Sequence, residues 1–296
     1  MWACMITLYK IFIATILIFN FIMITLKRFE NIKEEVVKGI SDLFDYVFVN
    51  AKEDDYILFL ADGEYMDGLS KSTARLNPYV IDDRRDRYRD ETRMKFFVEF
   101  LKYSYSFPNG VDETRDDFYN ISIELMIYCH IWESKVFLKQ LRRMACLAKG
   151  ETYSWKLEVP EMSKHDFIRN EIKAELEKCK LSLGAIIRKG FHSSLRNAFA
   201  HSEYVINMEG SLIYLDTYKG AAWDIRLISF NDWSERFVYS ALLSYFFLVE
   251  KYKRRKSIVS DLGDDTFTIV HPINDTKFRT TKIYYNEESD SFSFVR

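Results

Sequence analysis

The segment that spans residues 191–205 holds the side chains of this sequence that are best suited to chemistry. On a helix, with about 100° between successive residues, Asn197 and His201 lie on one side, and the long stem of Arg196 can swing toward them. A guanidinium stays charged at any useful pH and holds phosphate oxygens in a bidentate fork. An imidazole titrates near neutrality and can move protons to and from the oxygens of a ribose–phosphate linkage. These residues predict phosphodiester cleavage without a metal ion, and the need for an internal 2′-hydroxyl nucleophile favours RNA over DNA.

The spacing of these residues is not decisive, because an arginine followed five positions later by a histidine arises easily by chance. Two structural roles are therefore also open. Arg196 can pair with an acid such as Glu203, and His201 can cap the end of a helix. His130 lies in an aromatic helical stretch and is expected to be a core histidine or a structural histidine whose hydrogen bonds are satisfied. The catalytic and structural interpretations differ in whether the arginine–histidine pair faces a cleft or is buried against its own chain.

Further side chains could bind an RNA substrate beside this cluster. The basic run 251–256 is either a contact for the RNA backbone or a solvated helix end. His192 lies four residues before Arg196, and it can belong either to the site or to the remaining surface. The expected substrate-binding residues are His192, Tyr204, Lys251, Lys253 and Arg254.

The composition limits both the fold and the ligands. Of 296 residues, 48% are hydrophobic and 29% are charged, which is typical of a globular chain and excludes disorder along most of it. Only 10 glycines and 4 prolines are present, which disfavours sandwiches and propellers and favours long helices. A formal charge of −2 means that any RNA contact needs a local basic patch. The cysteines and histidines form no C-x-x-C or H-E-x-x-H pair, so neither a metal site nor another cofactor is expected, and a reducing intracellular setting fits best.

Apolar residues at helical spacing predict the helices that must position the cluster. Ser163 and Asp166 form a capping-box pattern at the start of the fourth helix. Asn231 or Asp232 is expected to cap the last helix. Helices are predicted over residues 29–49, 93–107, 116–148, 163–189 and 233–253.

Strands are predicted in two places. Apolar runs between residues 204 and 228 indicate a β-hairpin followed by a third strand. The runs 267–270 and 282–285 are rich in β-branched and aromatic residues and indicate strands near the end of the sequence. The predicted fold class is therefore mainly α, with a hairpin inserted before the last helix and a small β appendage.

The first 26 residues form the most apolar run, interrupted by Lys10 and Asn20. Counted from residue 5, the run is long enough to span a bilayer, and the cations that follow it would hold the rest of the chain in the cytoplasm. A membrane anchor over residues 5–26 is one interpretation. A buried N-terminal helix, or a start codon assigned too early, is the other. The expected location is cytoplasmic, with or without attachment to the inner face of the membrane, and no removable signal peptide is expected.

The string from Leu195 to Tyr204 resembles the R-x4–6-H signature of HEPN domains, in the form in which a polar residue follows the arginine. The resemblance covers roughly residues 85–256. It implies a helical bundle that dimerises and brings two such helices into one composite, metal-independent endoribonuclease site. Arg196 and His201 would be catalytic and Asn197 the auxiliary polar residue. It also implies a prokaryotic anti-phage or toxin effector with an antitoxin or another regulator. In some HEPN toxins a tyrosine stands two residues after the histidine, where this sequence has Glu203.

Two other functions remain open from the residues. One is a non-catalytic HEPN-like module that binds a partner or a nucleotide, with or without a membrane tether. The other is a membrane-active abortive-infection protein whose toxicity comes from its first helix. The expected organisation is a hydrophobic segment, a helical extension, a HEPN-like domain and a β-rich appendage, at residues 1–26, 27–84, 85–256 and 257–296.

Overall fold

The computed structural model of this protein describes residues 22–66, 77–82, 84–107, 113–115, 118–216 and 225–295. Most of these residues are helical, which confirms the predicted mainly α class. The helices are α2 (Leu26–Asn50), α3 (Glu53–Leu60), α5 (Arg84–Ser104), α6 (Phe118–Glu133), α7 (Lys135–Ala148), α8 (Lys164–Asp166), the π-helical η1 (Phe167–Lys173), α9 (Ala174–Lys178), α10 (Leu183–Gly190), α11 (Ser193–Ala200) and α12 (Phe230–Leu262). The strands are β1 (Ile22–Thr25), β2 (Glu64–Tyr65), β3 (Tyr79–Val80), β4 (Glu113–Arg115), β5 (Tyr204–Asn207), β6 (Leu212–Leu215), β7 (Leu227–Ser229), β8 (Thr266–Pro272), β9 (Phe278–Asn286) and β10 (Ser291–Phe294).

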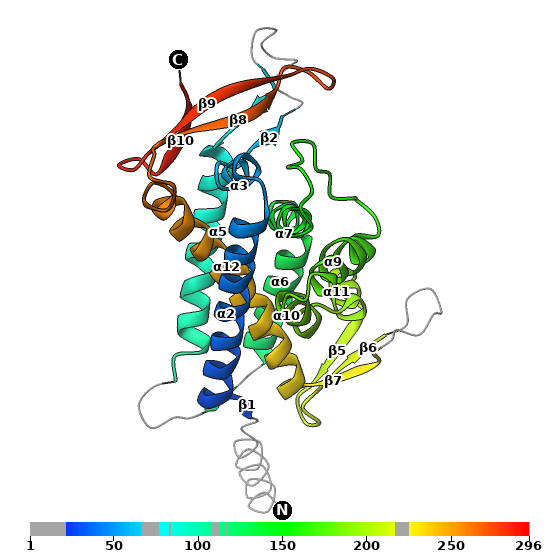
Figure 1. The fold of residues 1–296 in the computed structure, drawn as a ribbon. Coiled ribbons are helices and arrows are strands. Elements are labelled where there is room, and N and C mark those ends of the chain that lie inside the picture. Colours follow the sequence, from blue (N-terminus) through cyan, green and yellow to red (C-terminus); the bar gives the residue numbers. More distant parts are fainter. Residues whose placement is uncertain are drawn as a thin grey trace, which may run out of the picture.

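Helix α12 is the longest helix in the described part of the chain and runs through the middle of the molecule (Figure 1). It packs against α2, α10 and α6 and buries large side chains such as Trp233 and Phe237. Ser229 caps its start, because the Ser229 hydroxyl accepts a hydrogen bond from the Asp232 backbone N–H at 3.1 Å. The prediction of Asn231 or Asp232 as the cap is therefore wrong, since both lie inside the first turn.

Helix α2 confirms the helix predicted over residues 29–49. The Thr25 hydroxyl caps it by accepting a hydrogen bond from the Arg28 N–H at 3.2 Å. The apolar residues that recur at helical spacing, among them Ile32, Val36 and Ile40, are all buried against α12 and α7. Local periodicity is therefore sufficient to place this helix.

Two predicted helices are broken in the structure. The stretch 116–148 divides into α6 and α7, because Ser134 caps α7 by accepting a hydrogen bond from the Phe137 N–H at 3.4 Å. The stretch 163–189 divides between α9 and α10, and η1 precedes α9. Ser163 is wrong as a capping-box residue, because its φ of +58° is left-handed and its side chain makes no capping hydrogen bond.

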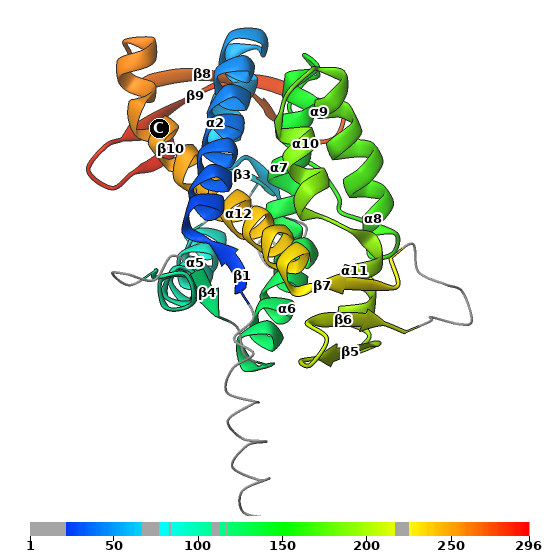
Figure 2. The same ribbon diagram turned by 90° about the horizontal axis from the view of Figure 1, so that it is seen from below.

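Two three-stranded antiparallel sheets lie at opposite ends of the molecule (Figures 1 and 2). Strands β5, β6 and β7 follow α11 directly, and Tyr204 pairs with Leu215 at the first position of the β5–β6 ladder. Strand β9 lies between β8 and β10, and these strands contain the predicted runs 267–270 and 282–285. Buried residues of this second sheet, such as Ile283, belong to the same core as the helices.

The predicted anchor over residues 5–26 falls mostly on residues 1–21, which lie outside the described part of the chain. The described part of this segment begins with β1, which pairs with β4 and contains the buried Ile24. Helix α2 begins directly after it. None of the helices in the described ranges is long and apolar enough to cross a membrane.

Candidate active site

Helix α11 carries the predicted catalytic residues and packs against α6. Its inner side is fully buried through Leu195 and Ala198. His192 caps its start, because His192 Nδ1 accepts a hydrogen bond from the Ser194 N–H at 3.2 Å. The His192 backbone N–H in turn donates to the Tyr128 hydroxyl at 2.9 Å. His192, which was expected to bind substrate, therefore serves to begin the helix.

The described helix ends at Ala200, so the helix expected through residues 191–205 is too long. Ser202 leaves the helical conformation with a left-handed φ of +58°. His201 is the C-cap, and its backbone N–H donates to the Asn197 backbone carbonyl at 3.1 Å. Its side chain is exposed. The imidazole is thus accessible from solvent although its backbone closes the helix.

The Arg196 guanidinium is held by residues of its own chain. Its Nη1 donates a hydrogen bond to the side-chain carbonyl of Asn197 at 2.6 Å, and its Nη2 forms an ion pair with Glu133 of α6. The side chain is only 17% exposed, and this burial lowers the pKa of Arg196, although a guanidinium remains charged near neutral pH. The acid beside Arg196 is therefore Glu133 and not Glu203.

Glu133 bridges two cations. Its second oxygen accepts a hydrogen bond from the Lys164 ammonium at 2.6 Å, and the Lys164 side chain is 9% exposed. One carboxylate thus lies between a guanidinium and an ammonium, the two groups that most often bind a phosphate. Glu133 and Lys164 were not predicted from the sequence, because they come from other elements and no motif connects them to Arg196.

A groove of about 360 Å³ adjoins this ion cluster. His130 is exposed and lines it, so the prediction of a core histidine is wrong. Tyr204 is half-buried against Phe199, with 5.2 Å between ring centroids, and burial raises its pKa. Burial also raises the pKa of Cys129 to about 11, so this thiol is neutral and is not a nucleophile. The groove is lined by Leu125, Met126, Cys129, His130, Glu133, Phe199, Ala200 and Tyr204.

The basic run near the end of α12 does not line this groove. Lys251 is 2% exposed and forms an ion pair with Asp62, which corrects the expectation that it contacts RNA or solvent. Arg254 donates to Glu250 at 2.6 Å and pairs with Asp45 at 2.7 Å. The exposed members are Lys253, with 68% of its side chain accessible, and Lys256. Lys251 and Arg254 are therefore occupied by ion pairs within the chain, and no residue of the run lines the groove.

Within the described ranges, no three histidine, cysteine, aspartate or glutamate side chains gather where they could hold a metal ion. No protein-family model matches the sequence, and no curated protein or solved structure matches it either. Arg196, Asn197 and His201 do not line the groove themselves, and Glu133 connects Arg196 to it. The basis for inferring a function is therefore the contact of Arg196 with Asn197 and Glu133, together with the exposed His201 at the end of α11.

Proposed function

We propose that this protein is a metal-independent endoribonuclease with a HEPN-like helical bundle, acting as an effector of prokaryotic anti-phage defence or as a toxin. One observation carries the proposal: the Arg196 guanidinium and the Asn197 amide are in direct contact on α11, and the exposed His201 follows at the end of the same helix. The groove next to Glu133 offers space for a substrate. A homodimer would place two copies of this cluster in one composite site.

The proposed reaction is an in-line attack of the ribose 2′-oxygen on the adjacent phosphorus. The attacking hydroxyl loses its proton to an imidazole, a new P–O2′ bond forms and the P–O5′ bond breaks. The leaving 5′-oxygen receives a proton from an imidazolium. Arg196 binds the scissile phosphate and Asn197 orients the guanidinium. The products are a 2′,3′-cyclic phosphate and a 5′-hydroxyl, and no water is consumed in this step.

The first experiment measures cleavage of RNA by the purified protein in EDTA, with and without an extract of phage-infected cells to supply a trigger. We expect products with cyclic phosphate ends, and we expect Arg196→Ala to lower the rate by about 10²–10³-fold because one preorganised charge is lost. Arg279→Ala, on the exposed side of β9, is the matched control and should cleave like the wild type. Absence of cleavage in both arms, or equal rates for Arg196→Ala and wild type, contradicts the proposal.

Glu133 should compete with the substrate for Arg196. Glu133→Gln keeps the shape of the side chain but removes its charge, so an RNA phosphate no longer has to displace a carboxylate. A charge at about 4 Å is worth about 1 kcal/mol in water, which predicts about fivefold tighter RNA binding. Filter binding with non-cleavable 2′-deoxy-substituted RNA measures this. The control is Glu209→Gln in the exposed β5–β6 turn, and unchanged or weaker binding by Glu133→Gln alone would disprove the competition.

A second candidate function rests on the same ion cluster. Glu133 holds both Arg196 and Lys164 within one chain, an arrangement that also suits a non-catalytic module that binds a partner protein or a nucleotide. If the protein binds RNA or another partner but cleaves nothing in either arm of the cleavage assay, this module is the better description. An antitoxin or regulator is a proposed partner in both cases.

A further inference from the structure

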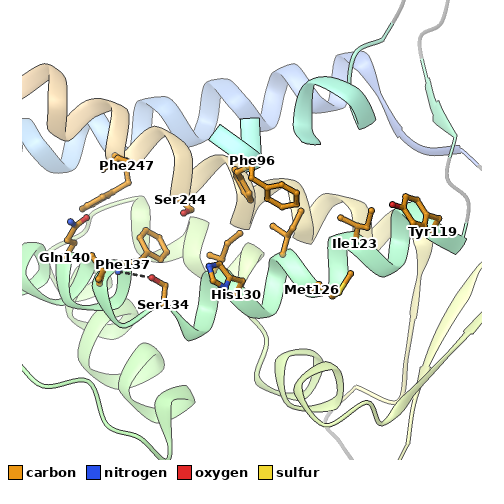
Figure 3. Close-up of a pocket in the computed structure, with 15 residues that line it drawn as sticks. Phe96, Tyr119, Ile123, Met126, His130, Ser134, Phe137, Gln140, Ser244 and Phe247 are labelled. Atoms are coloured by element: carbon orange, nitrogen blue, oxygen red, sulfur yellow. Dashed lines mark hydrogen bonds between the residues drawn. The ribbon is translucent and has the colours of Figure 1, made fainter. Parts of the chain in front are cut away.

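A second pocket, of about 590 Å³, lies along an adjacent face of α6 (Figure 3). Helices α5, α6, α7 and α12 supply its walls. Its volume is within the range of about 300–1,000 Å³ that is typical of small-molecule sites. It is lined by Phe96, Phe97, Tyr119, Ile123, Met126, Ile127, His130, Ile131, Ser134, Val136, Phe137, Gln140, Ser244, Phe247 and Leu248.

The pocket is elongated along α6. Lining residues recur at each turn of α6 from Tyr119 to Ile131, which is about 18 Å at a rise of about 1.5 Å per residue. Most of the lining side chains are aliphatic or aromatic. This elongated and mainly apolar lining suits a ligand with a hydrocarbon chain.

Three polar side chains lie in one half of this pocket. Figure 3 shows Gln140, Ser134 and Ser244 toward one end, His130 near the middle, and Ile123 and Tyr119 toward the other end. The Gln140 side chain lines the pocket although Gln140 is only 7% exposed.

Two of these polar side chains are open to a ligand. The Gln140 amide and the Ser244 hydroxyl form no hydrogen bond with another residue in the part of the chain that the structure describes. Neither is among the fully buried polar atoms without a partner, so both are accessible to water. A ligand head group that replaces this water can hydrogen-bond with them.

We propose that this pocket binds a free, neutral, single-chain amphiphile. Its hydrocarbon chain lies along α6 among the aromatic and aliphatic side chains, and its hydroxyl or amide head hydrogen-bonds with Gln140 and Ser244. No lysine, arginine, aspartate or glutamate is among the described lining residues, so a charged head would be buried without a counterion. Met126 and His130 also line the groove beside Glu133, but binding here does not depend on RNA cleavage.

The experiment uses the full chain and titrates it with decanol, decanoate and decyltrimethylammonium by calorimetry. We expect one decanol per chain, with decanoate and the cationic amphiphile binding at least about tenfold more weakly. Gln140→Leu should weaken decanol binding by about three- to tenfold, the value of one neutral hydrogen bond. The same variant without ligand should melt at a temperature close to that of the wild type, because the Gln140 amide forms no hydrogen bond with another described residue.

A second variant separates the pocket from general effects on folding. Val136→Phe fills the pocket and should abolish decanol binding, whereas Val270→Phe on the exposed side of β8 should leave it unchanged. Decanol binding that is equal in Val136→Phe and wild type overturns the proposal. Stronger binding of a charged amphiphile than of decanol also overturns it. Binding to neutral phospholipid vesicles without binding to free decanol does the same, as does a change of oligomeric state that accounts for the heat measured by calorimetry.

Discussion

Replacing His201 by alanine is expected to lower the rate constant of RNA cleavage by about 10²–10⁴-fold, the range that a positioned general acid or base contributes. The His201 side chain is exposed at the end of α11, and its contribution to the helix is a backbone hydrogen bond that alanine also makes. The fold and the affinity for RNA should therefore stay close to those of the wild type. The loss should appear in the rate constant and not in the RNA concentration that gives half-maximal rate.

Single-turnover cleavage in EDTA measures this effect. Because His201 is open to solvent, added imidazole should restore part of the rate of His201→Ala and none of the rate of Arg196→Ala. If His201→Ala cleaves at the wild-type rate, His201 has no part in proton transfer. The same conclusion follows if the affinity of this variant for RNA falls by the same factor as its cleavage rate.

How much of this site follows from the sequence depends on how local each contact is. Arg196 and Asn197 are neighbours on one short helix, and their hydrogen bond follows from that adjacency. The end of α11 could not be predicted from the spacing of apolar residues. It is set by the left-handed backbone conformation of Ser202, and serine also occurs inside helices. Glu133 reaches Arg196 only because α6 packs against α11, and packing partners are not encoded in a local pattern.

The same distinction applies to the fold. The buried apolar stripe of α2 and the strands before α12 could be predicted, because both follow from the spacing of apolar residues that lie only a few positions apart. The break at Ser134 was not predicted, because apolar residues continue at helical spacing across it. The basic run on α12 was read as exposed, whereas Lys251 and Arg255 are buried. Charge alone does not distinguish a solvated face from a paired interior cation, since the acids that pair with these cations come from distant segments.

Arg255 is the clearest of these buried cations, with 1% of its side chain exposed. Its guanidinium donates to the Leu60 carbonyl at 2.7 Å, to Asp82 at 2.9 Å and to Asp290 at 3.2 Å. It also lies 5.1 Å from the centre of the Phe292 ring. Burial by itself would lower the pKa of Arg255, but the charges of the surrounding carboxylates raise it above the ordinary value, so the group is a permanent cation. It connects α12 to α3 and to the β9–β10 turn.

Arg255→Met should therefore lower the free energy of unfolding by about 3–5 kcal/mol, because the buried Asp82 and the half-buried Asp290 lose the cation that compensates their charges. Arg254→Met, one position earlier, is the matched control. It breaks a partly buried pair with Glu250 and a pair with the exposed Asp45, and should cost about 1–2 kcal/mol. Urea denaturation of the two variants measures the difference.

Arg255→Lys tests why the loss is large. A lysine keeps the charge but has no planar fork, so it cannot donate to Leu60, Asp82 and Asp290 together. We expect it to recover less than half of the lost stability. Arg255→Met and Arg254→Met with equal midpoints and slopes would mean that the buried network contributes nothing beyond the ion pairs of Arg254. The expected result is a large loss in Arg255→Met with one unfolding transition and an unchanged slope, because the β8–β10 sheet and the helices share one core and unfold as one unit.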